Sequence, residues 1–236
     1  MLRRKQKKER ADAREKKESR QVPTEVDNRS ADWMTGNFSD DMAYMRETLS
    51  IGTNFDLVYR VIHIGGRQAC FYFIDGFCKD ELMEKLLQYF IELTEQEMAD
   101  DVHEMLKKHM PYVEVDVSNT WNDIIHNLMS GVLVLLIEGY EKAILIDSRT
   151  YPARSVSEPE KDKVLRGSKD GFVETVVFNT ALIRRRIRST DLRMEMMNAG
   201  ESSQTDIVIC YMDSRVDHEF LEKIKDGIRN IKVDAL

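Results

Sequence analysis

The sequence holds few residue sets whose types and spacing could carry catalysis or bind a metal. Its three cysteines have no CxxC spacing, and Cys70 and Cys210 lie in apolar stretches where a free thiol packs as a small hydrophobe. The five histidines show no HExxH or other metal-ligand spacing, and His103 and His109 are too far apart to share a helical face. Neither a phosphate-binding loop nor a GxSxG elbow is present. We therefore expect no enzyme, no metal site and no cofactor.

The densest group of charged candidates lies in the segment 147–188. Its arginines and glutamates are spaced along an expected loop and continue into an expected helix. This pattern suits bidentate arginine–carboxylate pairs that order a loop or join two subunits. Our assembly or structural candidates are Asp147, Arg149, Arg154, Glu158, Arg166, Gly167, Glu174, Asn179, Arg184, Arg185 and Arg186.

Three explanations of the run Arg184–Arg186 stay open. Cations in the last turn of a helix complement its dipole. The run could instead line an oligomer interface, or bind an anion or a nucleotide. Successive helical residues point about 100° apart, so at most two of the three arginines can address the same anion.

The chain divides its charge between a basic N-terminus and an acidic body. Residues 1–20 hold ten Lys/Arg and four acids, a net charge of +6, whereas the whole chain carries −7 and residues 21–236 therefore −13. We expect residues 1–36 to be disordered, because they offer little apolar surface to bury. Such a tail could keep the protein in solution, bind an anionic membrane surface or bind nucleic acid. The acidic body argues against nucleic acid.

Two classes of segment are excluded by hydropathy. The longest unbroken apolar run, Val132–Ile137, has six residues, whereas a membrane-spanning helix needs about 20. The charged residues 3–20 leave no room for the apolar core of a secretory signal. With three scattered cysteines and no disulfide framework, the sequence favours a reducing, cytosol-facing environment.

Hydrophobic periodicity predicts alternating helices and strands. Two pairs of strands surround glycine turns and form expected hairpins, and the apolar strands 68–74 and 205–212 are expected to lie at the centre of a sheet. The segment 148–171, with little periodicity, is long enough for a functional loop. The expected helices cover 37–49, 80–94, 95–109, 120–130, 172–188 and 217–228, and the expected strands cover 55–64, 68–74, 112–117, 132–137, 142–147, 193–197 and 205–212.

These elements predict an α/β fold of the α+β type, with two small subdomains that each hold a mixed β-sheet with hairpins flanked by helices. Both hairpins end in Ile-Asp, at Ile74-Asp75 and Ile146-Asp147, which hints at a repeat. We expect a basic tail over 1–36, a first subdomain over 37–118 and a second over 119–236.

The segment 147–188 resembles the A-subunit family of bacterial spore germination receptors, the GerA type, which includes the SpoVAF-like proteins. Asp56-Leu57-Val58-x-Arg60 and Asp75-Gly76 are similar to the family as well, and the resemblance covers residues 37–236. The matching strings are Asp147-x-Arg149-x-Tyr151-Pro152-x-Arg154-Ser155-x-x-Glu158-Pro159-Glu160, Val164-x-Arg166-Gly167, Gly171-Phe172-x-Glu174 and Asn179-x-Ala181-Leu182-Ile183-Arg184-Arg185-Arg186-Ile187.

The resemblance implies a soluble, cytosol-facing N-terminal domain of a longer protein of the spore inner membrane, whose helical membrane domain lies outside this chain. It implies a homo-oligomeric ion channel that works with other germination receptor subunits and links a nutrient signal to ion release. It carries no catalytic residue. We expect the segment 147–188 to hold neighbouring subunits in register. The alternative is a module that binds a small germinant in a cleft near Val117–Thr120, between the two halves.

Overall fold

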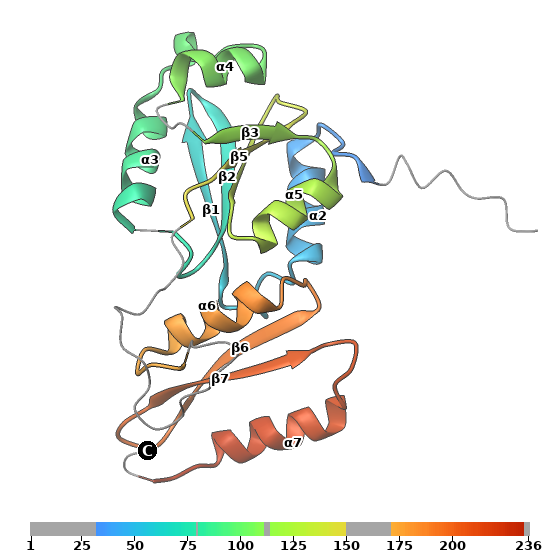
Figure 1. Ribbon diagram of the computed structural model, residues 1–236, viewed down its shortest axis with the longest axis vertical. Helices are drawn as coiled ribbons and strands as arrows, with labels where there is room; N and C mark the ends of the chain where they lie inside the picture. The colour runs from blue at the N-terminus through green and yellow to red at the C-terminus, as the bar shows by residue number, and fades with distance from the viewer. Residues whose placement is uncertain (1–31, 79, 111–113, 150–170, 234–236) are drawn as a thin grey trace, which may run out of the picture. The chain divides into compact units, whose positions relative to one another are not determined.

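The computed structural model describes residues 32–78, 80–110, 114–149 and 171–233. Residues 34–236 form one compact unit, to which all the elements below belong. The unit combines α-helices with antiparallel sheets, so the expected α+β fold is confirmed. Figure 1 shows the elements in chain order.

The larger sheet has five strands in the order β1-β2-β4-β5-β3, and every neighbouring pair is antiparallel. The first hairpin pairs β1 with β2 in a register that places Val61 opposite Cys70. The second hairpin pairs β4 with β5, so both expected hairpins are confirmed, and β2 lies inside the sheet as expected. The strands are β1 (Leu57–Ile64), β2 (Arg67–Ile74), β3 (Val115–Ser118), β4 (Leu133–Ile137) and β5 (Ala143–Ile146).

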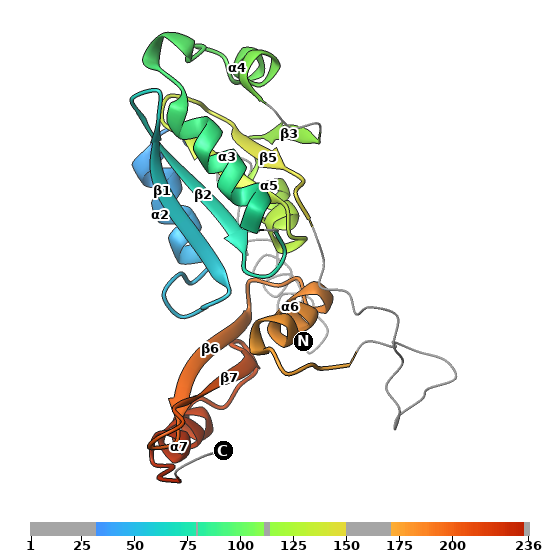
Figure 2. The same cartoon turned by 90° about the vertical axis from the view of Figure 1, so that its left-hand side faces the viewer.

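Helices cover both faces of this sheet (Figures 1 and 2). On one face, α2 (Phe38–Thr48) and α5 (Trp121–Met129) enclose a core that includes Met45, Tyr72 and Leu128. On the other, α3 (Asp80–Glu92) and α4 (Val102–His109) enclose a core that includes Phe71 and Phe90. Strands β2, β4 and β5 contribute to both cores, which explains why their sequences are apolar at nearly every position.

The expected boundary at 118/119 is wrong, because the sheet crosses it. Strand β3 ends at Ser118 and pairs with β5, and β2 pairs with β4, so strands from both expected subdomains form one hydrogen-bonded sheet. The helix expected over 95–109 is also divided, into a 3-10 turn η2 (Glu95–Glu97) and α4. Asp101 caps α4 by accepting hydrogen bonds from the backbone N–H groups of His103 and Glu104.

The C-terminal part contains α6 (Val176–Arg186) and a two-stranded sheet of β6 (Leu192–Ala199) and β7 (Thr205–Met212), followed by α7 (His218–Arg229). The expectation that 205–212 is a central strand is wrong, because β7 pairs only with β6 among the described strands. Its apolar character has another cause: α6 packs against β7, while α7 packs against β6.

Candidate functional site

A buried ion pair joins two regions of the compact unit. The first is the five-stranded sheet with its covering helices, and the second is the C-terminal part that contains α6, β6, β7 and α7. Arg184 on α6 donates from Nε to Asp56 Oδ2 at 2.7 Å and from Nη2 to Asp56 Oδ1 at 2.9 Å. The two residues are 128 positions apart, and their side chains are 0% and 2% exposed. Planar guanidinium and carboxylate groups form such bidentate pairs with a defined orientation. The pair therefore fixes how α6 meets the start of β1.

The remaining donors of this guanidinium bind the backbone that leads into β6. Arg184 Nη1 donates to the carbonyl oxygens of Ser189 at 3.0 Å and Leu192 at 3.2 Å. Arginine thus satisfies buried acceptors on both sides of the contact, which a lysine ammonium without the planar fork would not do. The charge is compensated and the polar atoms are paired, as a buried ion requires.

Backbone and amide hydrogen bonds extend the contact to β6. The N–H of Met194 donates to Asn54 Oδ1 at 2.8 Å, and the N–H of Phe55 donates to the Met194 carbonyl at 3.1 Å. Asn54 Nδ2 in turn donates to the Leu49 carbonyl at 2.9 Å. Residues 54–55 thereby occupy the outer edge of β6. We call the set Asn54, Phe55, Asp56, Arg184, Leu192 and Met194 the junction.

The loop after β2 approaches α6 closely at the same place. Gly76 has φ +80°, and a Cβ there would lie 3.3 Å from Ala181 Cβ and 3.4 Å from Val177 Cγ1. The N–H of Asp75 donates to the Asp56 carbonyl at 2.9 Å. A glycine permits both the left-handed backbone and the short distance to the helix. Asp75-Gly76 and the arginine run, which lie far apart in the sequence, thus meet beside the ion pair.

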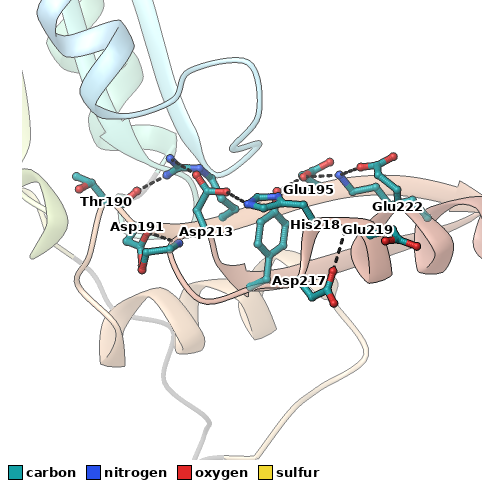
Figure 3. Close-up of polar contacts among 12 residues, drawn as sticks. Thr190, Asp191, Glu195, Asp213, Asp217, His218, Glu219 and Glu222 are labelled. Atoms are coloured by element: carbon teal, nitrogen blue, oxygen red, sulfur yellow. Dashed lines mark hydrogen bonds and ion pairs between the residues drawn. The ribbon is translucent and has the colours of Figure 1, made fainter.

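Polar side chains continue along the β6–β7–α7 part (Figure 3). Glu195 accepts hydrogen bonds from the Tyr211 hydroxyl and from Lys225 Nζ, the latter at 2.9 Å, and Lys225 also pairs with Glu222 at 2.9 Å. At the other end, Arg193 pairs with Asp213 at 3.1 Å. The Lys225–Glu195 pair connects α7 to the hairpin, whereas the Arg193–Asp213 pair connects β6 to the end of β7.

The same contacts shift the titration of their members. Burial by itself would raise the pKa of Glu195, but the hydrogen bonds from Tyr211 and Lys225 outweigh it and hold that pKa below its ordinary value. Burial and the bond to Glu195 raise the pKa of Tyr211 to about 12. The carboxylate form of Glu195 is therefore the form that the folded protein stabilises.

This shift predicts a loss of stability in acid. A carboxyl group whose pKa is lower in the folded state contributes stability above its unfolded pKa of about 4.3, and the contribution is lost as pH falls through the folded pKa. We expect the free energy of unfolding to fall below about pH 5, and to fall less steeply in Glu195→Gln. Urea unfolding from pH 7 to pH 3 measures this, with the exposed Glu219→Gln as the control. Equal slopes in wild type and Glu195→Gln would contradict it.

The structure places the expected site residues in several different environments. Asp147 and Arg149 form an ion pair two positions apart, with Arg149 Nε 2.7 Å from Asp147 Oδ1, and this pair lowers the pKa of Asp147. Asn179 closes the turn into α6, because its amide both accepts from the Val173 N–H and donates to the Val173 carbonyl at 2.7 Å. Glu174 is exposed.

Arg184, one of the expected assembly residues, is buried against Asp56 within the same chain and is therefore not exposed to a second subunit. Arg186 is exposed and Arg185 is half-buried, so the three arginines point in different directions as expected. Arg154, Glu158, Arg166 and Gly167 lie outside the described residues. The residues that the reasoning from charge missed are Asn54 and Asp56, and the only signal was that Asp56 belongs to a stretch similar to the GerA type.

The described residues offer neither a metal centre nor a span. No three histidine, cysteine or acidic side chains within them lie close enough together to hold a metal ion. No helix in the same residues is both long and apolar enough to cross a bilayer.

Comparison with known families gives one match that covers most of the chain. The family model described as Bacillus/Clostridium GerA spore germination protein matches residues 43–236. The match includes the junction and all the strands.

Individual relatives carry sporulation and germination names. The chain is 33% identical over 194 residues to stage V sporulation protein AF of Bacillus subtilis (strain 168), which covers 82% of this chain and 39% of that protein. It is 25% identical over 190 residues to spore germination protein KA of the same organism, covering 79% of this chain and 35% of the relative. The chain thus spans about two fifths of the length of these relatives.

A solved structure shares the fold. The crystal structure of the N-terminal domain of the A subunit of the Bacillus megaterium spore germinant receptor GerK3 matches with a TM-score of 0.65 at 22% identity. The match covers 86% of this chain and 74% of that one. At this identity the likeness concerns the fold.

Proposed function

Because this chain belongs to the GerA family of Bacillus/Clostridium spore germination proteins, we propose that it is the N-terminal domain of a germination protein of the spore inner membrane. The domain faces the cytosol of the spore core, and a helical domain beyond it holds the protein in the membrane. It acts without catalysis, through contacts with further copies of itself and with other germination receptor subunits.

The single observation that supports a coupling role is the buried Asp56–Arg184 pair. It connects the region of the five-stranded sheet to the C-terminal part with the β6–β7 hairpin and α7. The connection is one bidentate contact, and the Asn54–Met194 hydrogen bond lies beside it. A displacement at the hairpin is passed to the start of β1 unless the buried pair breaks, and breaking it would leave an uncompensated charge. The two regions therefore move together or separate at a large cost.

Such a contact suits a domain that links a nutrient signal to ion release. A signal can bias a membrane pore only if it stabilises one of two arrangements over the other. A rigid contact transmits a change in packing between subunits, whereas a flexible linker would absorb it. In this proposal, assembly sets neighbouring domains in register and the junction carries the change within each domain.

Germination kinetics test the proposal. In the test strain, the only copy of the full-length protein carries Arg184→Lys. Lysine keeps the positive charge but lacks the planar guanidinium that binds a carboxylate through two hydrogen bonds. We expect slower ion release after nutrient is added, at an unchanged protein level by immunoblot. Spores with Arg46→Lys, the same exchange at an exposed arginine on α2, should behave as wild type. Normal kinetics in spores that lack the protein altogether would contradict a role in germination, and normal kinetics in Arg184→Lys alone would contradict the role of the junction.

A cavity favours a second candidate function, the binding of a small molecule. It has a volume of about 610 Å³ beside α3, at the end of β2, and not near 117–120 where a cleft was expected. Its lining combines Arg60 with Asp75, Glu84 and Gln88 around apolar side chains. Opposite charges around an apolar floor suit a zwitterionic amino acid. A rise in melting temperature with amino acids that is lost in Glu84→Gln would support binding, and no rise at millimolar concentration would contradict it.

A further inference from the structure

The two hairpins of the chain carry opposite charges. Residues 57–74, which form the β1–β2 hairpin, contain Arg60 and Arg67 and no acid. Residues 192–212, which form the β6–β7 hairpin, contain three acids and one arginine, Arg193, which pairs with Asp213 just after the hairpin. Of the three acids, Glu195 pairs with Lys225 within the chain, whereas Glu201 and Asp206 are exposed. A basic hairpin thus stands out in a body with a net charge of −13.

Each hairpin also ends in a strand with an open edge. Strand β1 is the last strand of its sheet, and β7 is the last strand of the smaller sheet. Within the described residues, the outer edge of β1 receives no backbone hydrogen bond from another segment, and on β7 only the terminal Met212 carbonyl does, from the N–H groups of Arg215 and Val216. An edge strand leaves half of its backbone N–H and C=O groups available to another strand.

The other two edges are short or partly occupied. On β3, the Asp116 carboxylate accepts the N–H of Val117 at 2.8 Å, which removes a donor from a strand of only four residues. On β6, residues 54–55 occupy the edge through Met194. Short edges and inward-bonded acids are common protections against unwanted strand pairing. The bonds at Leu192 and Met194 thus occupy the first half of the β6 edge, whereas β7 is occupied only at its last residue, and β1 and β7 keep the longer open edges.

Exposed apolar side chains accompany the open edges. Tyr59 and Val61 on β1 are 38% and 46% exposed. On β7, Cys210 is exposed as well. A long edge with apolar side chains would drive aggregation unless a specific strand covered it.

We propose that β1 of one copy pairs with β7 of a second copy, which extends the five-stranded sheet across the interface. Both strands have eight residues, so the edges match in length. The basic β1–β2 hairpin of one copy then meets the acidic β6–β7 hairpin of the next, with Arg60 and Asp206 as the exposed charged residues of the two paired strands. This complementarity selects a second copy as the occupant. The inference rests on the assembly role proposed above and supplies its surface.

This contact uses different surfaces on the two copies. It is therefore heterologous and repeats from head to tail, since every copy offers both β1 and β7. Such a contact closes into a ring when the rotation between copies permits it.

Charge exchange tests the interface. In sedimentation velocity of the 236-residue chain over a range of concentrations, Arg60→Glu and Asp206→Lys should each weaken self-association at least ~10-fold, because each places like charges across the contact. An equimolar mixture of the two variants should recover association, since each variant then meets a complementary partner. Lys107→Glu, an exposed reversal on α4, is the matched control and should leave association unchanged. Unchanged melting temperatures verify folding.

The outcomes separate the two proposals. If the wild type associates and both reversals leave association unchanged, the β1–β7 surface is wrong while the assembly role stands. A mixture that associates no better than either variant alone also overturns the pairing. A wild type that stays monomeric at every concentration contradicts both the assembly role and this surface. The germination test of the junction measures ion release and does not depend on the outcome of this experiment.

Discussion

Replacing Arg184 by methionine is expected to lower the free energy of unfolding by about 3–5 kcal/mol. The substitution keeps most of the side-chain volume but leaves the Asp56 carboxylate buried without its partner. It also removes the donor to the carbonyls of Ser189 and Leu192. Urea unfolding at pH 7, followed by circular dichroism, measures the change.

The exposed Arg186 on the same helix provides the matched control. Arg186→Met should change the free energy of unfolding by no more than about 0.5 kcal/mol, as is usual for surface positions. A loss of less than about 1 kcal/mol in Arg184→Met would mean that water or another side chain compensates Asp56. In that case the pair would not hold the two regions together.

Replacing Asn54 by alanine should cost about 2–4 kcal/mol, because two buried backbone groups lose their partners. These are the N–H of Met194 and the carbonyl of Leu49, which Asn54 satisfies from a position that is only 3% exposed. The same urea experiment measures the loss. Hydrogen exchange adds a local readout, since the amide of Met194 should exchange faster than in the wild type.

Asn198 on β6 is the control for this change. Its side chain bonds to Asp206 and the Gln204 carbonyl at the surface, so Asn198→Ala should cost no more than about 1 kcal/mol. If Asn54→Ala and Asn198→Ala have equal effects, the polar bridge to β6 contributes nothing beyond an exposed hydrogen bond.

Local signals in the sequence were sufficient for most of the elements. The alternation before Gly65-Gly66, the turn itself and the apolar run after it predicted the first hairpin, and apolar residues three and four apart predicted the helices. These signals succeed because the period of burial follows from the geometry of each element. They also predicted that β2 lies inside the sheet, since both of its faces are apolar.

The same reasoning placed β7 wrongly for a physical reason. A strand covered by helices and a strand between two neighbours are both apolar, and periodicity does not distinguish them. The boundary at 118/119 failed in a similar way, because each hairpin predicts its own pairing but not the pairing of β2 with β4, which are separated by residues 75–132.

Local sequence patterns could not predict the junction. Arg184 is one of three consecutive arginines at the end of a helix, where cations are common on the surface. Nothing in the neighbouring residues distinguishes the buried one, because its partner Asp56 lies 128 positions earlier. The expectation of a subunit contact at Arg184 therefore gave way to a contact within the chain.

The measurement that tests the account most directly is a double-mutant cycle on the pair, with Asp56→Asn, Arg184→Met and both together. If the pair holds the two regions in register, the double variant should be less destabilised than the sum of the single variants. The interaction free energy should then be about 2–3 kcal/mol. Additive effects, within about 0.5 kcal/mol, would show that the two side chains do not depend on each other and would contradict the coupling role of the junction.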